Sequence, residues 1–369
     1  MKLRDKISWL MGRVQGSLFP HLNQCLATPL TEQEERLVSI LEIVQVERYV
    51  SKTITRFRYP GRKLLDRQAL ARAFVAKACY RYATTSDLRR ALLSAVNLRR
   101  ICGFVTANDI PSDSTFSRAF SEFAVDGLGS QVHDALVEKY LSNELLGHIS
   151  RDSTAIIGRE KPAKKAGKEP KKPRKRGRPA KGEQRDAAPE KRLDRQVGQT
   201  AEEAIGELPV ACDRGTKKNA KGYKMSWNGY KLHLDTNDIG LPISALVTSA
   251  SLHDSQVAIP LIKLTSRKVT YFYDLMDAAY DANRIEEVSR ASGHVPIIDK
   301  NKRRNEVLPM APHEAERYKM RSSAERANSR LKEDFGANNV MVKGHAKVSL
   351  HLMFGVIALF SDQLMRILG

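Results

Sequence analysis

The spacing of apolar residues divides the chain into a helical first part and a second part in which strands and helices alternate. Up to about residue 140, apolar side chains recur every three or four positions, as in residues 64–82 and 88–98, which predicts amphipathic helices. Residues 85–87 and 111–113 offer Ser, Thr and Asp as caps for two short helices. We therefore predict an all-helical N-terminal domain over residues 1–140.

Beyond residue 140 the pattern becomes that of an α/β fold. Alternating or β-branched runs predict strands, and the turn residues 237–240 join two of them as a hairpin. The expected strands are 147–156, 229–236, 241–250, 269–275 and 294–299. Helices are expected at 255–264, near 284–291 and from about 315 to 333. This second domain is predicted to occupy residues 141–369.

Two other apolar or amphipathic segments bear on location. The run at 350–360 contains His351 and is soon followed by Ser361 and Asp362, so it is too short to cross a bilayer and is expected to form a buried helix. The first fifteen residues are typical of an amphipathic helix and lack a long apolar core and a cleavage site. We predict a cytoplasmic protein without a membrane partner.

The composition favours a nucleic-acid partner. A net charge of +20 and a pI of about 9.8 make the surface attractive to polyanions. A chain of 369 residues that is 41% hydrophobic is long enough for two domains with a sizeable core. The four cysteines lack the close pairs that a zinc site requires, so we expect reduced, structural thiols at Cys25, Cys79, Cys102 and Cys212.

Half of the excess charge lies in residues 159–195, where sixteen basic residues face six acidic ones. Since large apolar residues are almost absent there, we predict a flexible basic insertion that interrupts the second domain over about 159–222. Arg176 and Arg178 lie in an R-G-R-P sequence that resembles an AT-hook, whose arginines enter a narrow A·T minor groove. The alternative is a polycationic loop that contacts phosphates of any sequence.

Two aspartates occur where strands of the predicted sheet end. Asp152 lies at or near the end of the first strand, and Asp277 lies where the strand 269–275 gives way to a helix. An open α/β sheet brings such residues to one edge. The alternative for a single aspartate after a strand is a helix N-cap.

The predicted helix 315–333 carries four spaced polar residues, Tyr318, Arg321, Glu325 and Lys332. Offsets of 3, 7 and 14 from the first residue place all four on one helix face. A solvated face carries charges at the same spacing, and Arg321 with Glu325 is also an ordinary i,i+4 pair.

These residues resemble the signature of the bacterial insertion-sequence transposases of the DDE class. The glutamate helix of that family carries Y-x2-R-x3-E-x6-K, which this chain matches from Tyr318 to Lys332, while RDSTAI around Asp152 and DAAYDA from Asp277 look like the family's two aspartate motifs. The resemblance implies an RNase H-like mixed β-sheet flanked by helices. It also implies that Asp152, Asp277 and Glu325 are catalytic and bind metal.

The resemblance further implies cleavage at insertion-sequence ends and strand transfer into target DNA, with two Mg²⁺ ions for which Mn²⁺ can substitute. Carboxylate oxygens suit Mg²⁺, and two hard cations activate the nucleophile and stabilise the leaving oxygen. DNA contacts are expected from Tyr318, Arg321 and Lys332, and DNA-end binding or dimerisation from the N-terminal domain. A homodimer on DNA, associated with the nucleoid, is expected. A stand-alone nuclease and a domesticated, non-catalytic DNA-binding protein are the alternatives.

Some residues depart from the family pattern or compete with it. Only 48 residues separate Asp277 from Glu325, too few for the β-rich domain that some relatives insert, so a hairpin mechanism that depends on it is doubtful. Ala279 replaces a frequent glycine, and Asp274 is a rival for the second metal ligand. His253 and Asp254 are interpreted as a loop pair that caps the following helix rather than as catalytic residues.

Overall fold

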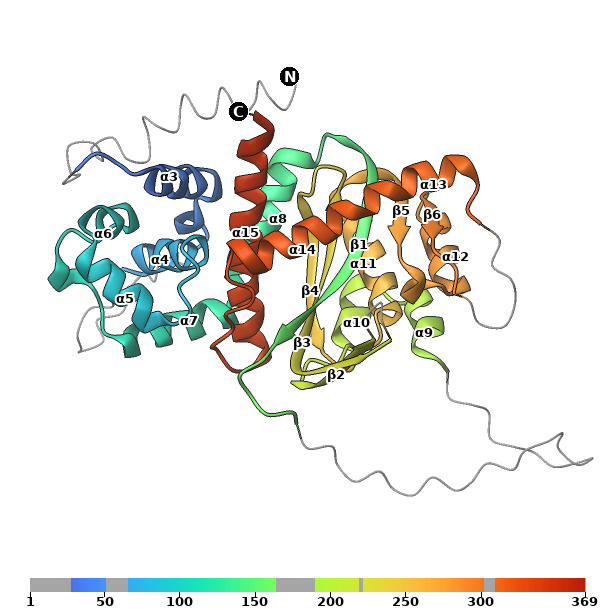
Figure 1. Cartoon of the computed structure of the whole chain (residues 1–369), viewed down its shortest axis with the longest axis horizontal. Coiled ribbons are helices and arrows are strands. Elements are labelled where there is room, and N and C mark those ends of the chain that lie inside the picture. The colour runs from blue at the N-terminus through green and yellow to red at the C-terminus, as the bar shows by residue number, and fades with distance from the viewer. Residues whose placement is uncertain (1–27, 51–65, 164–189, 219–221, 302–308, 369) are drawn as a thin grey trace, which may run out of the picture.

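The computed structural model describes residues 28–50, 66–163, 190–218, 222–301 and 309–368 (Figure 1). The predicted N-terminal amphipathic helix, the AT-hook arginines Arg176 and Arg178, and Cys25 lie outside these residues. Cys79, Cys102 and Cys212 are free thiols.

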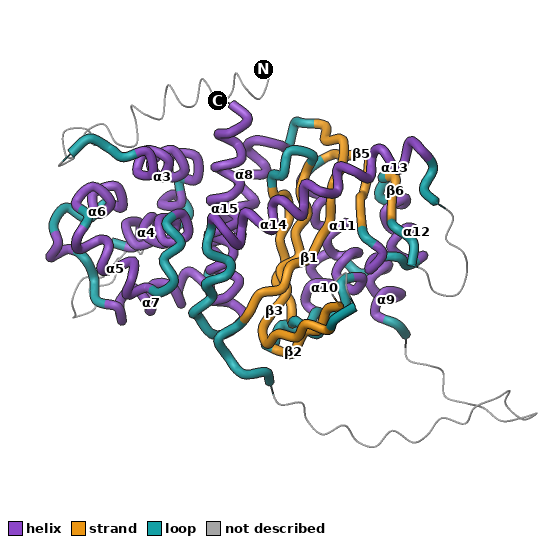
Figure 2. Tube along the Cα trace, in the orientation of Figure 1, coloured by secondary structure: helices purple, strands orange, loops and turns teal. Residues whose placement is uncertain are grey.

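The first part of the described chain is helical, as predicted, and Figure 2 shows it as a group of helices beside the strands. Thr84, one residue earlier than expected, forms a capping box with Asp87 at the start of one of these helices. The elements are α3 (Glu32–Val44), η1 (Val46–Arg48), α4 (Arg67–Cys79), α5 (Thr85–Ser94), α6 (Val96–Cys102), η2 (Ala107–Asp109), α7 (Asp113–Val125) and α8 (Leu128–Leu141).

The strands that the structure describes form one six-stranded mixed sheet. β1 pairs in parallel with β5, which pairs in parallel with β6, whereas β3 pairs antiparallel with β1, β2 and β4. The predicted hairpin is the β3–β4 connection, where Gly240 adopts a φ of 79° that favours glycine. The strands are β1 (Leu145–Ile157), β2 (Asp213–Lys218), β3 (Lys224–Asn237), β4 (Pro242–Ser249), β5 (Thr270–Met276) and β6 (Val295–Ile298).

Helices cover both faces of this sheet. Figure 1 shows α14 (Ser322–Asp334) crossing in front of β1, with α11 (Ser255–Lys268) behind the sheet. Successive residues of β1 confirm the two layers, because Asp152 contacts α14 while Arg151 shares Asp235 with Thr265 of α11. α12 (Asn283–Ala291) packs beside α11 and β6.

The predicted interruption over residues 159–222 is too long. Its described part from residue 190 onward forms α9 (Arg192–Gly198), α10 (Ala201–Gly206) and β2. The reason is tertiary: Leu193 packs against the cluster under α11 and α12, and Lys263 donates hydrogen bonds to backbone carbonyls at the end of α9. A few contacts of this kind give regular structure to a segment whose composition alone predicts no regular structure.

The predicted single helix over 315–333 is also interrupted. It consists of α13 (Pro312–Tyr318), the 3₁₀ turn η4 (Lys319–Arg321) and α14. Because a 3₁₀ turn has three residues per turn instead of 3.6, Tyr318 and Arg321 do not follow the α-helical spacing that Glu325 and Lys332 follow.

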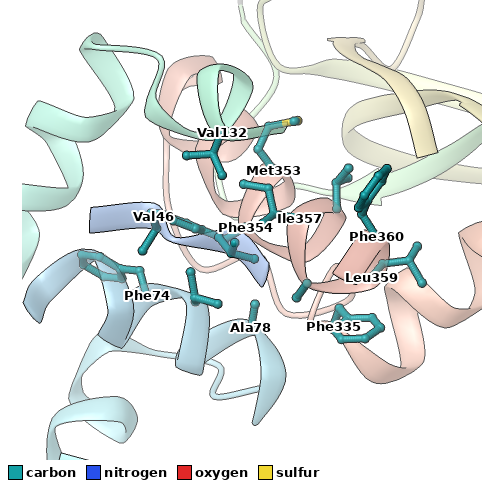
Figure 3. Close-up of a cluster of buried hydrophobic side chains, with 14 of the residues drawn as sticks. Val46, Phe74, Ala78, Val132, Phe335, Met353, Phe354, Ile357, Leu359 and Phe360 are labelled. Atoms are coloured by element: carbon teal, nitrogen blue, oxygen red, sulfur yellow. The ribbon is translucent and has the colours of Figure 1, made fainter. Parts of the chain in front are cut away.

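The longest helix, α15 (His345–Leu368), is the predicted buried helix and lies in the core of both parts of the chain. The prediction that this segment is too short to cross a bilayer was wrong, because the helix extends beyond the apolar run at both ends and is long and apolar enough to do so. The prediction of burial is correct, since 83% of its most apolar window is buried inside the protein. Figure 3 shows Phe354 of α15 between Phe74 of α4 and Val132 of α8, and Phe335 packs nearby. The predicted division at residue 140 therefore coincides with an element boundary, but a single hydrophobic core crosses it.

A cluster of arginines fixes α15 to its neighbours at Asp362, whose side chain is almost fully buried. Arg36 of α3, Arg330 of α14 and Arg366 of α15 all bind this carboxylate. Burial alone would raise the pKa of Asp362, but hydrogen bonds from Arg36 and Arg330 outweigh it and hold the pKa below its ordinary value.

Asp362→Asn is expected to lower the free energy of unfolding at neutral pH by about 2 kcal/mol, because it leaves half-buried guanidinium groups without their anion. The loss is expected to shrink as the pH falls through the ordinary aspartate range, because a carboxylate with a depressed folded pKa stabilises only when ionised. Urea unfolding at several pH values measures both effects. Asp334→Asn is the control, because Asp334 is a second and more exposed partner of Arg330, four residues away on the same helix. This change is expected to cost a few tenths of a kcal/mol. Equal losses of stability in the two variants would contradict the role of Asp362.

Candidate active site

The register of β1 and β5 brings Asp152 and Asp277 together. The last parallel pair between these strands is Arg151 with Met276, so Asp152 and Asp277 are the next residue on each strand. Neighbouring strands lie about 4.8 Å apart. Asp152 is in the middle of β1 rather than at its end, but it is the first residue beyond the pairing with β5.

A buried ion cluster fixes this register from the opposite face of the sheet. The guanidinium of Arg151 has no exposed surface, donates two hydrogen bonds of 2.8 and 2.6 Å to Asp235 on β3, and lies 3.5 Å from Asp274 on β5. Asp274 also accepts hydrogen bonds from Tyr271 and Ser289. Asp274, the rival for the second metal ligand, is thus fully buried and already bound by these donors.

The three carboxylates predicted from the sequence meet around one arginine. The guanidinium of Arg321 lies 2.6 Å from Glu325, 3.6 Å from Asp277 and 4.0 Å from Asp152. Arg321 comes from η4, Glu325 from the first turn of α14, and the two aspartates from β1 and the end of β5. Side chains that are far apart in the sequence therefore converge, and the positive charge of the guanidinium reduces the repulsion between the three carboxylates.

The carboxylates differ in their surroundings. Burial is the largest influence on Asp152 and raises its pKa to about 6, with Arg321 acting in the opposite direction. The amide of Asn328 donates a 3.0 Å hydrogen bond to Asp152 Oδ2. The side chain of Glu325, by contrast, is 61% exposed. The site thus combines one desolvated carboxylate with one that is largely exposed and bound only by Arg321 among the described residues.

Asp277 is the N-cap that its position after a strand allows, and its second oxygen faces the arginine of the candidate site. Its Oδ1 accepts a 2.9 Å hydrogen bond from the backbone N–H of Ala279 and caps the short turn η3 (Ala278–Tyr280). Its Oδ2 is the atom that faces Arg321. The cap fixes the side chain so that one oxygen remains directed at the other carboxylates.

The two remaining signature residues lie on either side of this group. Tyr318 is half-buried, and burial raises its pKa to about 12, with Arg321 opposing the shift. Lys332 is also half-buried; burial and the nearby charge of Lys217 lower its pKa, whereas Asp152 raises it. Lys332 therefore lies close enough to Asp152 for the carboxylate to influence the pKa of the lysine.

The interpretation of His253 and Asp254 as a capping pair is only partly correct. His253 Nδ1 contacts the hydroxyl of Ser255 at the start of α11, but Asp254 makes no side-chain cap. Asp254 instead accepts a 2.8 Å hydrogen bond from Lys231 on β3, because an ion pair with a partly buried ammonium satisfies it better than a backbone N–H.

Sequence reasoning missed two contributors to this site, Asn328 and Arg151. Asn328 follows Glu325 by three residues, so helical spacing places it on the same side of α14. Arg151 is an arginine inside an otherwise apolar strand, next to Asp152. A charged residue at such a position requires a buried partner, which is a signal that the sequence alone contains.

Comparison with protein families gives two matches. Residues 193–361 match the family described as Transposase DDE domain, and residues 26–122 match the family described as Transposase domain (DUF772). No curated protein and no solved structure gives a significant match. The first match includes Asp277 and Glu325 but begins after Asp152, so the placement of Asp152 in the site depends on its register and on its contacts with Arg321 and Asn328.

We expect Arg321→Gln to lower the melting temperature in EDTA, because the three carboxylates then repel each other without their shared cation. Adding Mg²⁺ is expected to raise the melting temperature of the variant more than that of the wild type, where the ion must first displace the guanidinium. Arg326→Gln, which loses a bond to Ser322 only, is the matched control. If Mg²⁺ raised the melting temperatures of Arg321→Gln and Arg326→Gln by the same amount, this role for Arg321 would be contradicted.

Proposed function

The chain belongs to the DDE-class transposases of bacterial insertion sequences, and we propose that Asp152, Asp277 and Glu325 carry out its chemistry. Its catalytic half has the RNase H-like mixed sheet of that class. The proposed reaction is cleavage at the ends of an insertion sequence followed by strand transfer into target DNA. The convergence of three carboxylates from three separate elements on Arg321 is the observation that supports it.

The donor set fits a hard divalent cation. Transposases of this class generally use divalent metal ions, and Mg²⁺ prefers carboxylate oxygens, which all three side chains supply. Among the described residues no group of three or more His, Cys, Asp or Glu side chains could hold an ion as they stand, and the three carboxylates are instead in contact with the guanidinium of Arg321. Glu325 is largely exposed, so a change of its rotamer brings its carboxylate towards the aspartates.

Two bound Mg²⁺ ions, for which Mn²⁺ can substitute, would lower the pKa of a nucleophilic water and stabilise the departing oxygen. Other residues of the chain orient the carboxylates that would hold these ions. Asn328 orients Asp152, the backbone cap orients Asp277, and burial makes an adjacent cation favourable for Asp152. Hydrolysis frees a 3′-hydroxyl at the element's end, and the same site then uses that hydroxyl to attack a phosphodiester of the target.

Three further signature residues are proposed to contact DNA. Lys332 lies two turns beyond Glu325 on α14, about 10 Å along the helix axis, and is suited to a phosphate beside the cleaved bond. Arg321, once displaced from the carboxylates, is a second phosphate ligand, and Tyr318 can stack on or hydrogen-bond to the DNA end. Arg176 and Arg178 remain proposed minor-groove contacts that lie outside the described residues.

The proposed partners are the terminal inverted repeats of the element and the target DNA, which the net charge of +20 attracts. We propose that the helical N-terminal part binds the element's ends or dimerises, and that a homodimer pairs the two ends. The cell compartment proposed is the cytoplasm, in association with the nucleoid.

The decisive experiment incubates the protein with its element ends, Mg²⁺ and a target plasmid. Asp152→Asn, Asp277→Asn and Glu325→Gln are each expected to slow cleavage by roughly a thousandfold or more, about 4 kcal/mol, because each removes a metal-binding charge. Asn and Gln keep an oxygen that accepts the existing hydrogen bonds, so the fold and DNA binding are expected to remain. Product gels and a gel-shift assay measure the two properties separately.

Glu333→Gln, an exposed glutamate on the same helix, is the matched control and is expected to cleave normally. Joined products in the wild type support the transposase. Nicked products without joining point to a stand-alone nuclease, and retention of DNA without cutting points to a non-catalytic binding protein. Either of these last two results rejects the proposed reaction.

A further inference from the structure

A pocket with a positively charged lining lies where the helical part of the chain meets the base of α15. Its volume is about 300 Å³. It lies between α4, α5 and α7 on one side and the segment from residue 341 to the first turns of α15 on the other, with Arg159 beyond the end of β1. The polar residues that line it include Lys77, Thr84, Ser117, Arg159, Lys343 and Lys347.

The charge of this pocket is not neutralised. Among the described residues that line it there is no carboxylate, and neither Lys343 nor Lys347 forms an ion pair with any described residue. Arg159 makes only a long hydrogen bond of 3.5 Å to the carbonyl of Met341. Unpaired cations beside one another are unfavourable, so an anion that enters the pocket gains their combined attraction.

Two carboxylates belong to residues next to the pocket lining, Asp87 and Glu160. Asp87 accepts hydrogen bonds from Thr84 and pairs with Arg90. Glu160 accepts hydrogen bonds from the hydroxyl of Tyr230 and the backbone N–H of Gly344. Asp87 is therefore paired with a cation outside the pocket, and the single charge of Glu160 is smaller than the combined positive charge of Arg159, Lys343 and Lys347.

Lys77 contributes a buried cation to the same lining. Its side-chain ammonium donates a 3.2 Å hydrogen bond to the carbonyl of Ala83, and burial lowers its pKa to about 8, with Asp87 opposing the shift. An ammonium has three donors, so Lys77 retains donors for a further acceptor. Hydroxyls of Thr84 and Ser117 add the neutral donors that commonly bind phosphate oxygens.

The pocket lies within the reach of a DNA duplex that occupies the proposed active site. Arg159 follows Asp152 by seven residues of nearly extended chain, a span of about 23 Å. That span corresponds to about seven base pairs of B-form DNA. A single duplex can therefore contact both the carboxylates and the pocket.

We infer that this pocket binds a phosphate of the DNA backbone and thereby clamps element DNA against both the helical part and the catalytic part of the chain. The inference rests on the proposed function, since it takes DNA as the substrate. It assigns the pocket to positioning the duplex, because phosphate contacts fix register and orientation without reading sequence.

The test measures binding of a fluorescent duplex oligonucleotide by anisotropy in EDTA, at several salt concentrations, so that catalysis plays no part. The double variant Lys343→Gln/Lys347→Gln is expected to bind several-fold more weakly. The slope of log K against log salt is expected to be smaller by about 1, because one lost phosphate contact removes about 0.9 from it. Arg267→Gln/Arg290→Gln, on α11 and α12, changes the net charge equally and is expected to keep the wild-type slope.

Ser117→Trp fills the pocket without changing its charge and is expected to weaken binding as well. Circular dichroism and the melting temperature verify that each variant is folded. Wild-type binding by both Lys343→Gln/Lys347→Gln and Ser117→Trp, or an equal loss in the Arg267→Gln/Arg290→Gln control, overturns the inference. Such a result leaves the proposed function intact, because the proposed function fails only if the wild type does not cleave and join element ends.

Discussion

The candidate site depends on an ion cluster that takes no direct part in it. Arg151 sits opposite Asp235 in the β1–β3 register and reaches Asp274 on β5, so one guanidinium ties the central strand to both neighbours. A charge without exposed surface is costly unless it is fully paired, and a shift of β1 by one residue would leave it unpaired. The same shift would turn Asp152 to the wrong face. The free-energy cost of leaving Arg151 unpaired on one face of the sheet thus keeps Asp152 in its position on the other face.

Local patterns in the sequence were sufficient for most of the architecture. Alternation in β3 and β4 with a glycine turn predicted their hairpin, the apolar run at 350–360 predicted the buried middle of α15, and the spacing of Arg321 and Glu325 predicted their i,i+4 contact. These features depend on residues close to one another in the chain. The positions of Asp152 and Asp277 at strand ends suggested one common sheet edge, but that the two strands are neighbours depends on strand order, which local patterns do not contain.

The features that the sequence did not yield depend on distant partners. α9 is ordered because Lys263 binds its terminal carbonyls, which the composition of residues 159–195 could not indicate. The 3₁₀ turn η4 contacts β1 and β5, and Arg321, its last residue, lies beside the two aspartates. In the single regular α-helix that the sequence predicted, Tyr318, Arg321, Glu325 and Lys332 would all follow one helical spacing.

The position of α15 has a consequence for how the protein is made. This helix follows every other described element in the chain, yet the helices α4 and α8 and the strand β4 all bury apolar side chains against it. Neither part can complete its core while α15 is still within the ribosome. A nascent chain therefore exposes the apolar surfaces of both parts until α15 has been synthesised. An element copy with a premature stop before residue 345 would yield a polypeptide that aggregates or is degraded, rather than a truncated DNA-binding competitor.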